Sequence, residues 1–250
     1  MYYQMWIWSK FENVIAHFLI AMMEELIILY YVLFYMFLLM YYHYNDIISY
    51  KEVAYMGKIK LLHGSDHIIE KPDLLLGKTN NDYGRGFYCT QELSMAMEWA
   101  CKKNSDGFVN KYVLEQDSLN ILNLLDGKYN ILHWMALLLK NRTFRLSNEI
   151  AIDACDYIIE NFSIDLKAYD VIIGYRADDS YFSFAESFVQ NGLPLRSLNE
   201  ALHLGRLGTQ TVLISEKSFR NLTFDGADFA DKTVYYPKFI ARDSNARETY

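Results

Sequence analysis

Residues 84–90 have the sequence Gly84-Arg85-Gly86-Phe87-Tyr88-Cys89-Thr90, the most informative stretch of the chain. Two glycines flank one arginine, so the backbone can approach a bulky ligand here with no Cβ atom in the way. Phe87 and Tyr88 then resume the aromatic pattern that is typical of a strand. The stretch therefore predicts a short strand that presents a tyrosine beside a ligand-binding turn.

A second strand pattern lies upstream of this stretch. Residues 58–63 alternate polar and apolar side chains and end at His63, which is followed by the turn residue Gly64 and by Ser65. A histidine at the end of a strand is usually only a polar turn residue. The glycine and aromatic stretch downstream favours a binding role instead, because the two strands together supply an imidazole and an aromatic ring.

These residues resemble the core of the ADP-ribosyltransferase superfamily. Further blocks that carry the resemblance are Asn81-Asp82-Tyr83, Glu98-Trp99-Ala100 and Asp170-Val171-Ile172-Ile173-Gly174-Tyr175-Arg176-Ala177-Asp178-Asp179-Ser180-Tyr181-Phe182. Within that superfamily, the stretch from Lys58 to about Tyr236 is similar to the bacterial DUF3990 family. The resemblance implies an α+β fold, the split β-sandwich of ADP-ribosyltransferases, in which two small sheets pack face to face with helices on their flanks.

The same resemblance implies that the chain acts on NAD. His63 would bond to the adenosine ribose, Gly64 would offer backbone hydrogen bonds to the nicotinamide amide, and Tyr88 would stack on the nicotinamide ring. The superfamily carries a glutamate at the start of a later strand, and the matching residue here is Gln210. Glutamine keeps the hydrogen bond to the nicotinamide ribose but lacks the charge. It therefore offers less stabilisation of the oxocarbenium-like state and less assistance as a general base, and a general base is typically worth ~10²- to 10⁴-fold in rate.

Loops beside these strands supply further predicted contacts. Arg85 either contacts the pyrophosphate or is solvated, and Arg176 follows a buried strand, where we expect it to engage a phosphate of NAD or of the acceptor. Asp178, Asp179 or Glu216 could supply the carboxylate that position 210 lacks. The predicted catalytic residues are Tyr88 and Gln210, and the predicted cofactor-binding residues are His63, Gly64, Ser65, Arg85, Gly86, Tyr88 and Arg176.

The function implied by the resemblance is NAD-dependent mono-ADP-ribosyl transfer, or NAD hydrolysis, by a bacterial protein of the toxin or effector type. The acceptor would be an unidentified protein or nucleic acid, and an antitoxin or a small neighbouring protein would be a further partner. The alternative is a catalytically inert module of the same fold that binds NAD, ADP-ribose or a protein partner. The glutamine at position 210 favours this alternative.

Charge and cysteine usage narrow the class of protein. Residues 56–250 hold 22 of the 24 Lys and Arg residues and 26 of the 31 Asp and Glu residues, a net charge of −4. A nucleic-acid surface normally shows as a basic excess, so this balance disfavours an RNA 2′-phosphotransferase of the same superfamily. Three cysteines without C-x-x-C spacing fit a reducing cytoplasm, and no metal site is predicted because the histidines lack ligand spacing with cysteines or acids.

Residues 1–55 differ in composition from the rest of the chain. They contain no Gly and no Pro, and residues 26–42 are all apolar or aromatic. As a helix this run would be roughly 26 Å long, near the lower limit for spanning a bilayer. Three interpretations stay open: a membrane anchor with the domain on the cytoplasmic side, a hydrophobic hairpin or cap that packs on a partner, and upstream sequence ahead of a start at Met56.

The predicted organisation is a hydrophobic segment 1–55, a domain 56–240 and a charged tail 241–250. Within the domain, residue spacing predicts helices over 91–103, 129–139, 149–161, 183–190 and 198–204, and strands over 108–114, 121–124, 170–175 and 208–214. Residues 219–224 and the acidic stretch 225–231 are expected to end the compact part, and the tail is expected to fray or to form a short helix.

Overall fold

The computed structural model describes residues 34–36, 57–177, 179–204 and 208–249. The chain divides into two compact units, residues 1–55 and 56–250. Of the predicted membrane segment 26–42, only residues 34–36 are described, so that prediction lies outside the described residues. In the part of the chain that the structure describes, no helix has the length and apolar character needed to cross a membrane.

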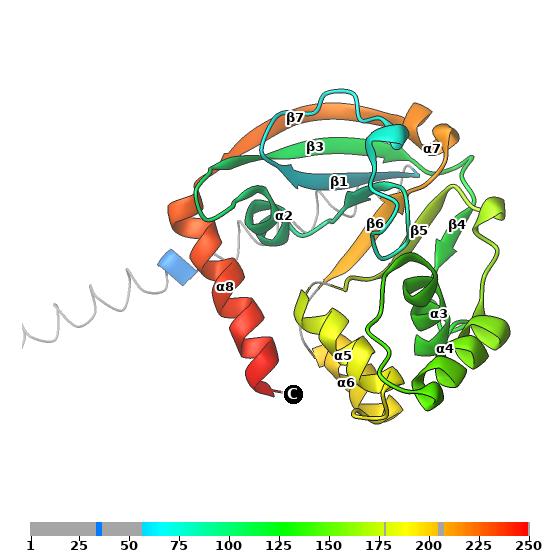
Figure 1. The fold of residues 1–250 in the computed structure, drawn as a ribbon. Coiled ribbons are helices and arrows are strands. Elements are labelled where there is room, and N and C mark those ends of the chain that lie inside the picture. Colours follow the sequence, from blue (N-terminus) through cyan, green and yellow to red (C-terminus); the bar gives the residue numbers. More distant parts are fainter. Residues whose placement is uncertain (1–33, 37–56, 178, 205–207, 250) are drawn as a thin grey trace, which may run out of the picture. The chain divides into compact units, whose positions relative to one another are not determined.

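Residues 56–250 form a mixed α+β unit with two sheets, which confirms the α+β part of the prediction (Figure 1). The first sheet is antiparallel and has the strand order β1 (Lys58–Ser65), β3 (Gly107–Glu115), β7 (Leu222–Ala230). The second sheet has the order β2 (Phe87–Cys89), β6 (Thr209–Leu213), β5 (Val171–Tyr175), β4 (Ile121–Asn123), with one parallel pair, β4 and β5.

The two sheets pack against each other through one apolar cluster. Leu61, Tyr112 and Leu114 come from the first sheet, and Phe87, Cys89, Val171 and Leu213 come from the second. Leu62, the neighbour of Leu61, belongs instead to a cluster on the opposite face of the first sheet. This alternation follows from the two-residue period of a strand, which buries both faces of β1.

Helices cover the outer faces of the two sheets (Figure 1). Helix α2 (Leu93–Ala100) packs on β1 and β3, and α8 (Lys232–Thr249) adds Tyr235 and Tyr236 to the same cluster. The second sheet is covered by α3 (Ile131–Asn141), α4 (Glu149–Phe162), α5 (Asp179–Val189) and α6 (Leu195–Leu204). The remaining short elements are α7 (Glu216–Arg220) and the 3₁₀ turns η1 (Leu74–Leu76) and η2 (Leu166–Ala168).

One backbone bridge joins the two sheets and positions the site. The amide of Leu62 donates to the carbonyl of Thr90 at 2.8 Å, and the amide of Thr90 donates to the carbonyl of Leu62 at 2.9 Å. These two bonds hold strand β1 of the first sheet against the end of strand β2 of the second sheet. As a result, His63 and Tyr88 lie next to each other, although 25 residues separate them in sequence.

The C-terminal part differs from the prediction. Residues 222–230, expected to end the compact part, form β7 at one edge of the first sheet, where charged residues are common. Lys111 on β3 pairs with Asp228 on this strand at 2.7 Å. Helix α8 runs from Lys232 to Thr249, so the predicted tail 241–250 does not begin at a break in structure.

Candidate functional site

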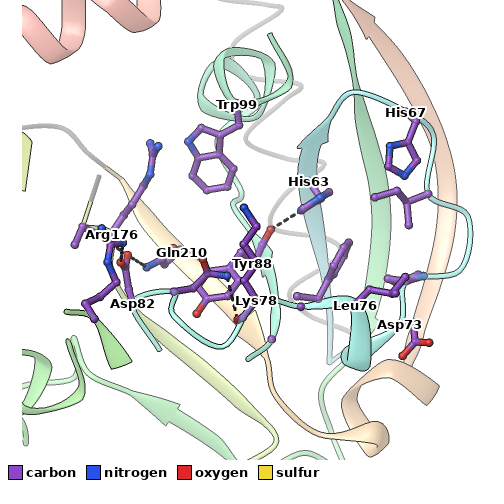
Figure 2. Close-up of a pocket in the computed structure, with 18 of the residues that line it drawn as sticks. His63, His67, Asp73, Leu76, Lys78, Asp82, Tyr88, Trp99, Arg176 and Gln210 are labelled. Carbon is purple, nitrogen blue, oxygen red and sulfur yellow. Dashed lines mark hydrogen bonds and ion pairs between the residues drawn. The ribbon is translucent and has the colours of Figure 1, made fainter. Parts of the chain in front are cut away.

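A cavity of roughly 640 Å³ lies beside the junction of β1 and β2. Its wall comprises His63 of β1, Tyr88 of β2, Trp99 of α2, Arg176 just after β5, and Gln210 of β6 (Figure 2). The loop between β1 and β2 and the residue Phe239 of α8 complete it. A cavity of this volume suits a small organic ligand, since such sites commonly measure about 300–1,000 Å³.

His63 is held in one orientation by its neighbours. Its Nδ1 lies 2.7 Å from the carbonyl oxygen of Tyr88, and its ring stacks on Phe87 with the ring centres 4.4 Å apart. A carbonyl oxygen only accepts, so Nδ1 carries the proton in this bond. Burial lowers the pKa of the His63 imidazole, although the bond to Tyr88 opposes the shift. The neutral ring therefore offers Nε2 as an acceptor, and no described residue bonds to that atom.

The hydroxyl of Tyr88 is used within the protein. It donates to the carbonyl of Gly84 at 2.7 Å and accepts from the amide of Tyr83 at 3.0 Å. The glycine is required there because its φ is +75°, in the left-handed region. Burial raises the pKa of the Tyr88 phenol far above its ordinary value, so the hydroxyl stays protonated. The part of Tyr88 that is left for a ligand is its ring.

A buried carboxylate, Asp82, connects several elements at the base of the cavity. Its Oδ1 accepts from the guanidinium of Arg142 at 2.9 Å, and its Oδ2 accepts from the amide of Ala177 at 2.8 Å and from Nε2 of Gln210 at 3.1 Å (Figure 2). The Asp82 residue is only 6% exposed. Burial raises the pKa of its carboxyl group, whereas the hydrogen bonds and the charges of Arg142 and Arg176 act in the opposite direction.

Positive charge prevails along the cavity wall. The guanidinium of Arg176 lies 4.5 Å from the ring centre of Trp99, and Arg142 lies 4.4 Å from that of Phe182. The charged lining residues are the cations Lys71, Lys78, Arg142 and Arg176 and the acids Asp73 and Asp82. Because the unit as a whole carries excess negative charge, this local excess of cations points to an anionic ligand.

The structure brings together some predicted site residues and leaves others outside. His63, Gly86, Tyr88, Arg176 and Gln210 all line the cavity. Gly64, Ser65 and Arg85 do not line it. A Cβ atom on Gly64 would lie 2.2 Å from the carbonyl oxygen of Ala96, so this glycine lets α2 approach β1. The hydroxyl of Ser65 accepts from Asn110 at 2.9 Å, and Arg85 is exposed and donates to the carbonyl of Leu75 at 3.2 Å.

Of the three carboxylates proposed to replace the missing glutamate, only the Glu216 side chain is described, and it does not line the cavity. Glu216 begins α7, whereas the side chains of Asp178 and Asp179 lie outside the described part of the chain. Among the described residues, no group of three or more His, Cys, Asp and Glu side chains could hold a metal ion. Cys89, Cys101 and Cys155 are buried free thiols.

A family model described as a protein of unknown function (DUF3990) matches residues 59–224. The chain belongs to the DUF3990 family. No curated protein and no solved structure matches the chain. Among the described residues that line the cavity, the DUF3990 region contains all except Phe239. The family part of the chain therefore builds the site, and α8 adds one aromatic ring to its wall.

Sequence reasoning missed three functional candidates in the DUF3990 region: Asp82, Trp99 and Arg142. Asp82 stands two residues before Gly84, and an acid beside a ligand-binding turn was a usable signal. The ring of Trp99 faces the cavity, and its Nε1 is buried with no hydrogen-bond partner among the described residues. Arg142 follows α3, and no local pattern links it to a residue sixty positions away.

Proposed function

We propose that the DUF3990 cavity binds NAD and that the protein is a mono-ADP-ribosyltransferase or an NAD glycohydrolase. The observation that carries this proposal is the convergence of His63, Tyr88 and Gln210 on one cavity, from β1, β2 and β6. The resemblance to ADP-ribosyltransferases assigns NAD to these three positions. They are distant in sequence, so a shared cavity does not follow from the motifs themselves.

The chemistry of the lining suits each part of NAD. The unprotonated Nε2 of His63 can accept a hydrogen bond from a ribose hydroxyl, and the ring of Tyr88 can stack on nicotinamide. Arg176, Lys71 and Lys78 can bind the pyrophosphate, because guanidinium and ammonium groups form strong charge-assisted hydrogen bonds to phosphate oxygens. A dinucleotide with two riboses and a pyrophosphate uses all of these groups.

The fold is consistent with the proposal. Two small sheets that are joined beside His63 and covered on their outer faces by helices are what a split β-sandwich of the ADP-ribosyltransferase type requires. A toxin or effector role, a protein or nucleic-acid acceptor and an antitoxin partner belong to the same proposal. They rest on the family resemblance alone.

In the proposed reaction the bond between nicotinamide N1 and ribose C1′ breaks. The bonding electrons leave with nicotinamide, and the oxocarbenium-like ribose is captured by an acceptor nucleophile or by water, which then loses a proton. Tyr88 would hold the leaving group, and Gln210 would bond to the ribose that carries the developing charge. Because glutamine cannot act as a general base, we expect turnover to be slow unless the acceptor brings its own activation.

One observation favours the second candidate function, an inert module that binds NAD or ADP-ribose. Two described carboxylates line the cavity, Asp73 and Asp82, and both already accept hydrogen bonds within the protein. Asp82 is paired with Arg142, and Asp73 caps η1 by accepting from the amide of Leu75 at 2.8 Å. Among the described lining residues, the acid nearest to Gln210 is therefore engaged on both of its oxygens and is not free to take a proton from an acceptor.

Nicotinamide release from NAD by the full-length chain distinguishes the two functions. Tyr88→Ala removes the stacking ring, and Tyr157→Ala is the matched control, because Tyr157 lies on α4 and is 61% exposed. We expect release by the wild type and by the control, and at least tenfold less by Tyr88→Ala. Equal release by all three proteins would refute the assignment, and NAD binding that depends on Tyr88 without release would identify the inert module.

A further inference from the structure

Gln210 has one side-chain atom to offer a ligand. Its Nε2 donates to Oδ2 of Asp82 and to the carbonyl oxygen of Tyr175, both at 3.1 Å. An amide nitrogen has only two hydrogens, so both are engaged. The side chain lines the cavity, and no described residue donates a hydrogen bond to its Oε1. The atom that Gln210 can present is therefore the oxygen, an acceptor.

The orientation of this amide depends on Asp82. Reversing the amide would place Oε1 against a carboxylate oxygen and a carbonyl oxygen, neither of which can donate to it. Asp82 is itself fixed, because Arg142 and the amide of Ala177 bond to it at 2.9 Å and 2.8 Å. The next residue in the chain, Tyr83, donates its hydroxyl to the carbonyl of Tyr175 at 2.7 Å, the same carbonyl that accepts from Gln210. Asp82 thus belongs to a rigid hydrogen-bonded network beneath the cavity.

We propose that Asp82 is a positioning residue that turns the nitrogen of the Gln210 amide toward the protein and its oxygen toward the ligand, so that the cavity recognises a ligand hydroxyl at this point. The identity of the ligand rests on the proposed function, in which the hydroxyl is the 2′-hydroxyl of the nicotinamide ribose. Gln210 then presents the same kind of accepting atom as the glutamate of the superfamily. The negative charge lies behind it, on Asp82, where Arg142 neutralises it.

The test compares the affinities of the full-length chain for NAD and for the NAD analogue that lacks the 2′-hydroxyl of the nicotinamide ribose. We expect the wild type to prefer NAD by about tenfold, the value of one well-formed hydrogen bond. Gln210→Ala should abolish the preference, and Asp82→Asn should reduce it to about twofold, because an amide at position 82 no longer fixes the orientation of Gln210. In the Gln210→Ala background, Asp82→Asn should not change the preference any further.

Asp170→Asn is the matched control for loss of a buried acid. Asp170 is 8% exposed and pairs with Lys217, away from the cavity. We expect this variant to lose thermal stability and to keep the tenfold preference. A merely structural Asp82 would weaken the binding of both ligands equally and leave the preference intact. That result, or a preference in Asp82→Asn equal to that of the wild type, would overturn the proposal.

A second measurement separates failure of this inference from failure of the proposed function. If the wild type binds neither ligand, the NAD assignment fails, and the Asp82–Gln210 contact is judged without ligand, from the Tm of the two single variants and the double variant. A positioning contact predicts that the two Tm losses are clearly non-additive, because either change breaks the same bond. Additive losses would overturn the positioning role on their own.

Discussion

Each key side chain of the cavity is fixed by neighbouring groups of the protein and leaves one defined surface for a ligand. The carbonyl of Tyr88 holds His63 and leaves Nε2, while the turn at Gly84 holds the hydroxyl of Tyr88 and leaves the ring. Asp82 holds Gln210 and leaves Oε1. Binding to such a preorganised site costs little ordering of side chains, which favours a small and specific ligand.

The two roles of Tyr88 can be separated by substitution. Tyr88→Phe removes the hydroxyl and leaves the amide of Tyr83 and the carbonyl of Gly84 without this partner. We expect it to lower the free energy of unfolding by about 1–3 kcal/mol while keeping NAD affinity within about threefold, because the ring is retained. Tyr88→Ala should lose at least tenfold in affinity. Calorimetric titration together with thermal unfolding checks both, and equal affinities of the two variants would contradict a stacking role.

The protonation of His63 should make binding depend on pH. Burial holds the pKa of its imidazole below the ordinary value of about 6.5, so the ring is neutral and accepting at pH 7. Protonation turns Nε2 into a donor that cannot accept from a ribose hydroxyl. We therefore expect NAD affinity to be constant from pH 8 to about 6.5 and to fall at lower pH, by up to about tenfold per unit once the pKa is passed.

Two variants assign this pH dependence to one histidine. His63→Gln removes the titrating group at that position, so its affinity should no longer fall between pH 6.5 and 5. His67 also lines the cavity, but its side chain is 69% exposed and its Nδ1 lies 2.6 Å from Asp66. His67→Gln should keep the wild-type profile. If the pH profile flattens in His67→Gln and not in His63→Gln, the pH dependence comes from His67, which would contradict the role of His63.

How far single site residues can be predicted depends on whether the signal is local. His63 and Tyr88 are recognisable because each lies in a short strand pattern close to glycine, so the pattern and the chemistry coincide. Gly64 was assigned to the ligand, yet its position is explained by packing against α2. The link between Asp82 and Gln210 spans 128 residues, and no pattern near either residue indicates that the fold brings them together.

The close contact between α2 and β1 sets the position of one wall of the cavity. Trp99 lies on α2 and reaches the cavity, so the position of that helix sets the position of the ring. A Cβ atom on Gly64 would lie 2.2 Å from the oxygen of Ala96 and 2.6 Å from the nitrogen of Ala100, both backbone atoms. Gly64→Ala should therefore push α2 away and lower the free energy of unfolding by about 3 kcal/mol.

Gly127→Ala is the control for this substitution. Gly127 has a φ of +82°, but no atom lies within 4 Å of the Cβ position, so only backbone strain of about 1 kcal/mol is expected. Chemical denaturation measures both changes, and Trp99 should report the displacement of α2 only in Gly64→Ala. A loss no larger than that of the control would show that α2 is not held by this contact.

Helices and strands with strong periodicity were predictable from sequence. The predicted helix 149–161 is α4 (Glu149–Phe162), because its apolar residues keep a helical period throughout, and the predicted strand 170–175 is β5 (Val171–Tyr175), because a short continuous apolar run suits a buried strand. Strand β7 was missed because it lies at a sheet edge, where acidic residues interrupt the alternation. Helix α8 was expected at most as a short helix within 241–250, and its start at Lys232 was missed because it lacks a clear apolar stripe and is fixed by distant contacts, such as the pair of Arg242 with Glu98 at 2.8 Å.

At the scale of the chain, the unit 56–250 contains every described residue that lines the cavity and the three apolar clusters found among the described residues. We therefore expect residues 56–250, expressed alone, to unfold cooperatively and to bind NAD within about threefold of the affinity of the full-length chain. Parallel titrations of the two proteins make the comparison. A fragment that folds but binds more than tenfold more weakly would show that residues 1–55 take part in the site.

The location of NAD itself is best tested by a crystal structure of the full-length chain grown with NAD. The proposed function predicts the dinucleotide in the cavity beside the junction of β1 and β2, with nicotinamide on the ring of Tyr88 and the adenosine ribose at Nε2 of His63. A ribose hydroxyl should lie within hydrogen-bond distance of Oε1 of Gln210. NAD bound at another place, or an empty cavity at millimolar NAD, would contradict the assignment.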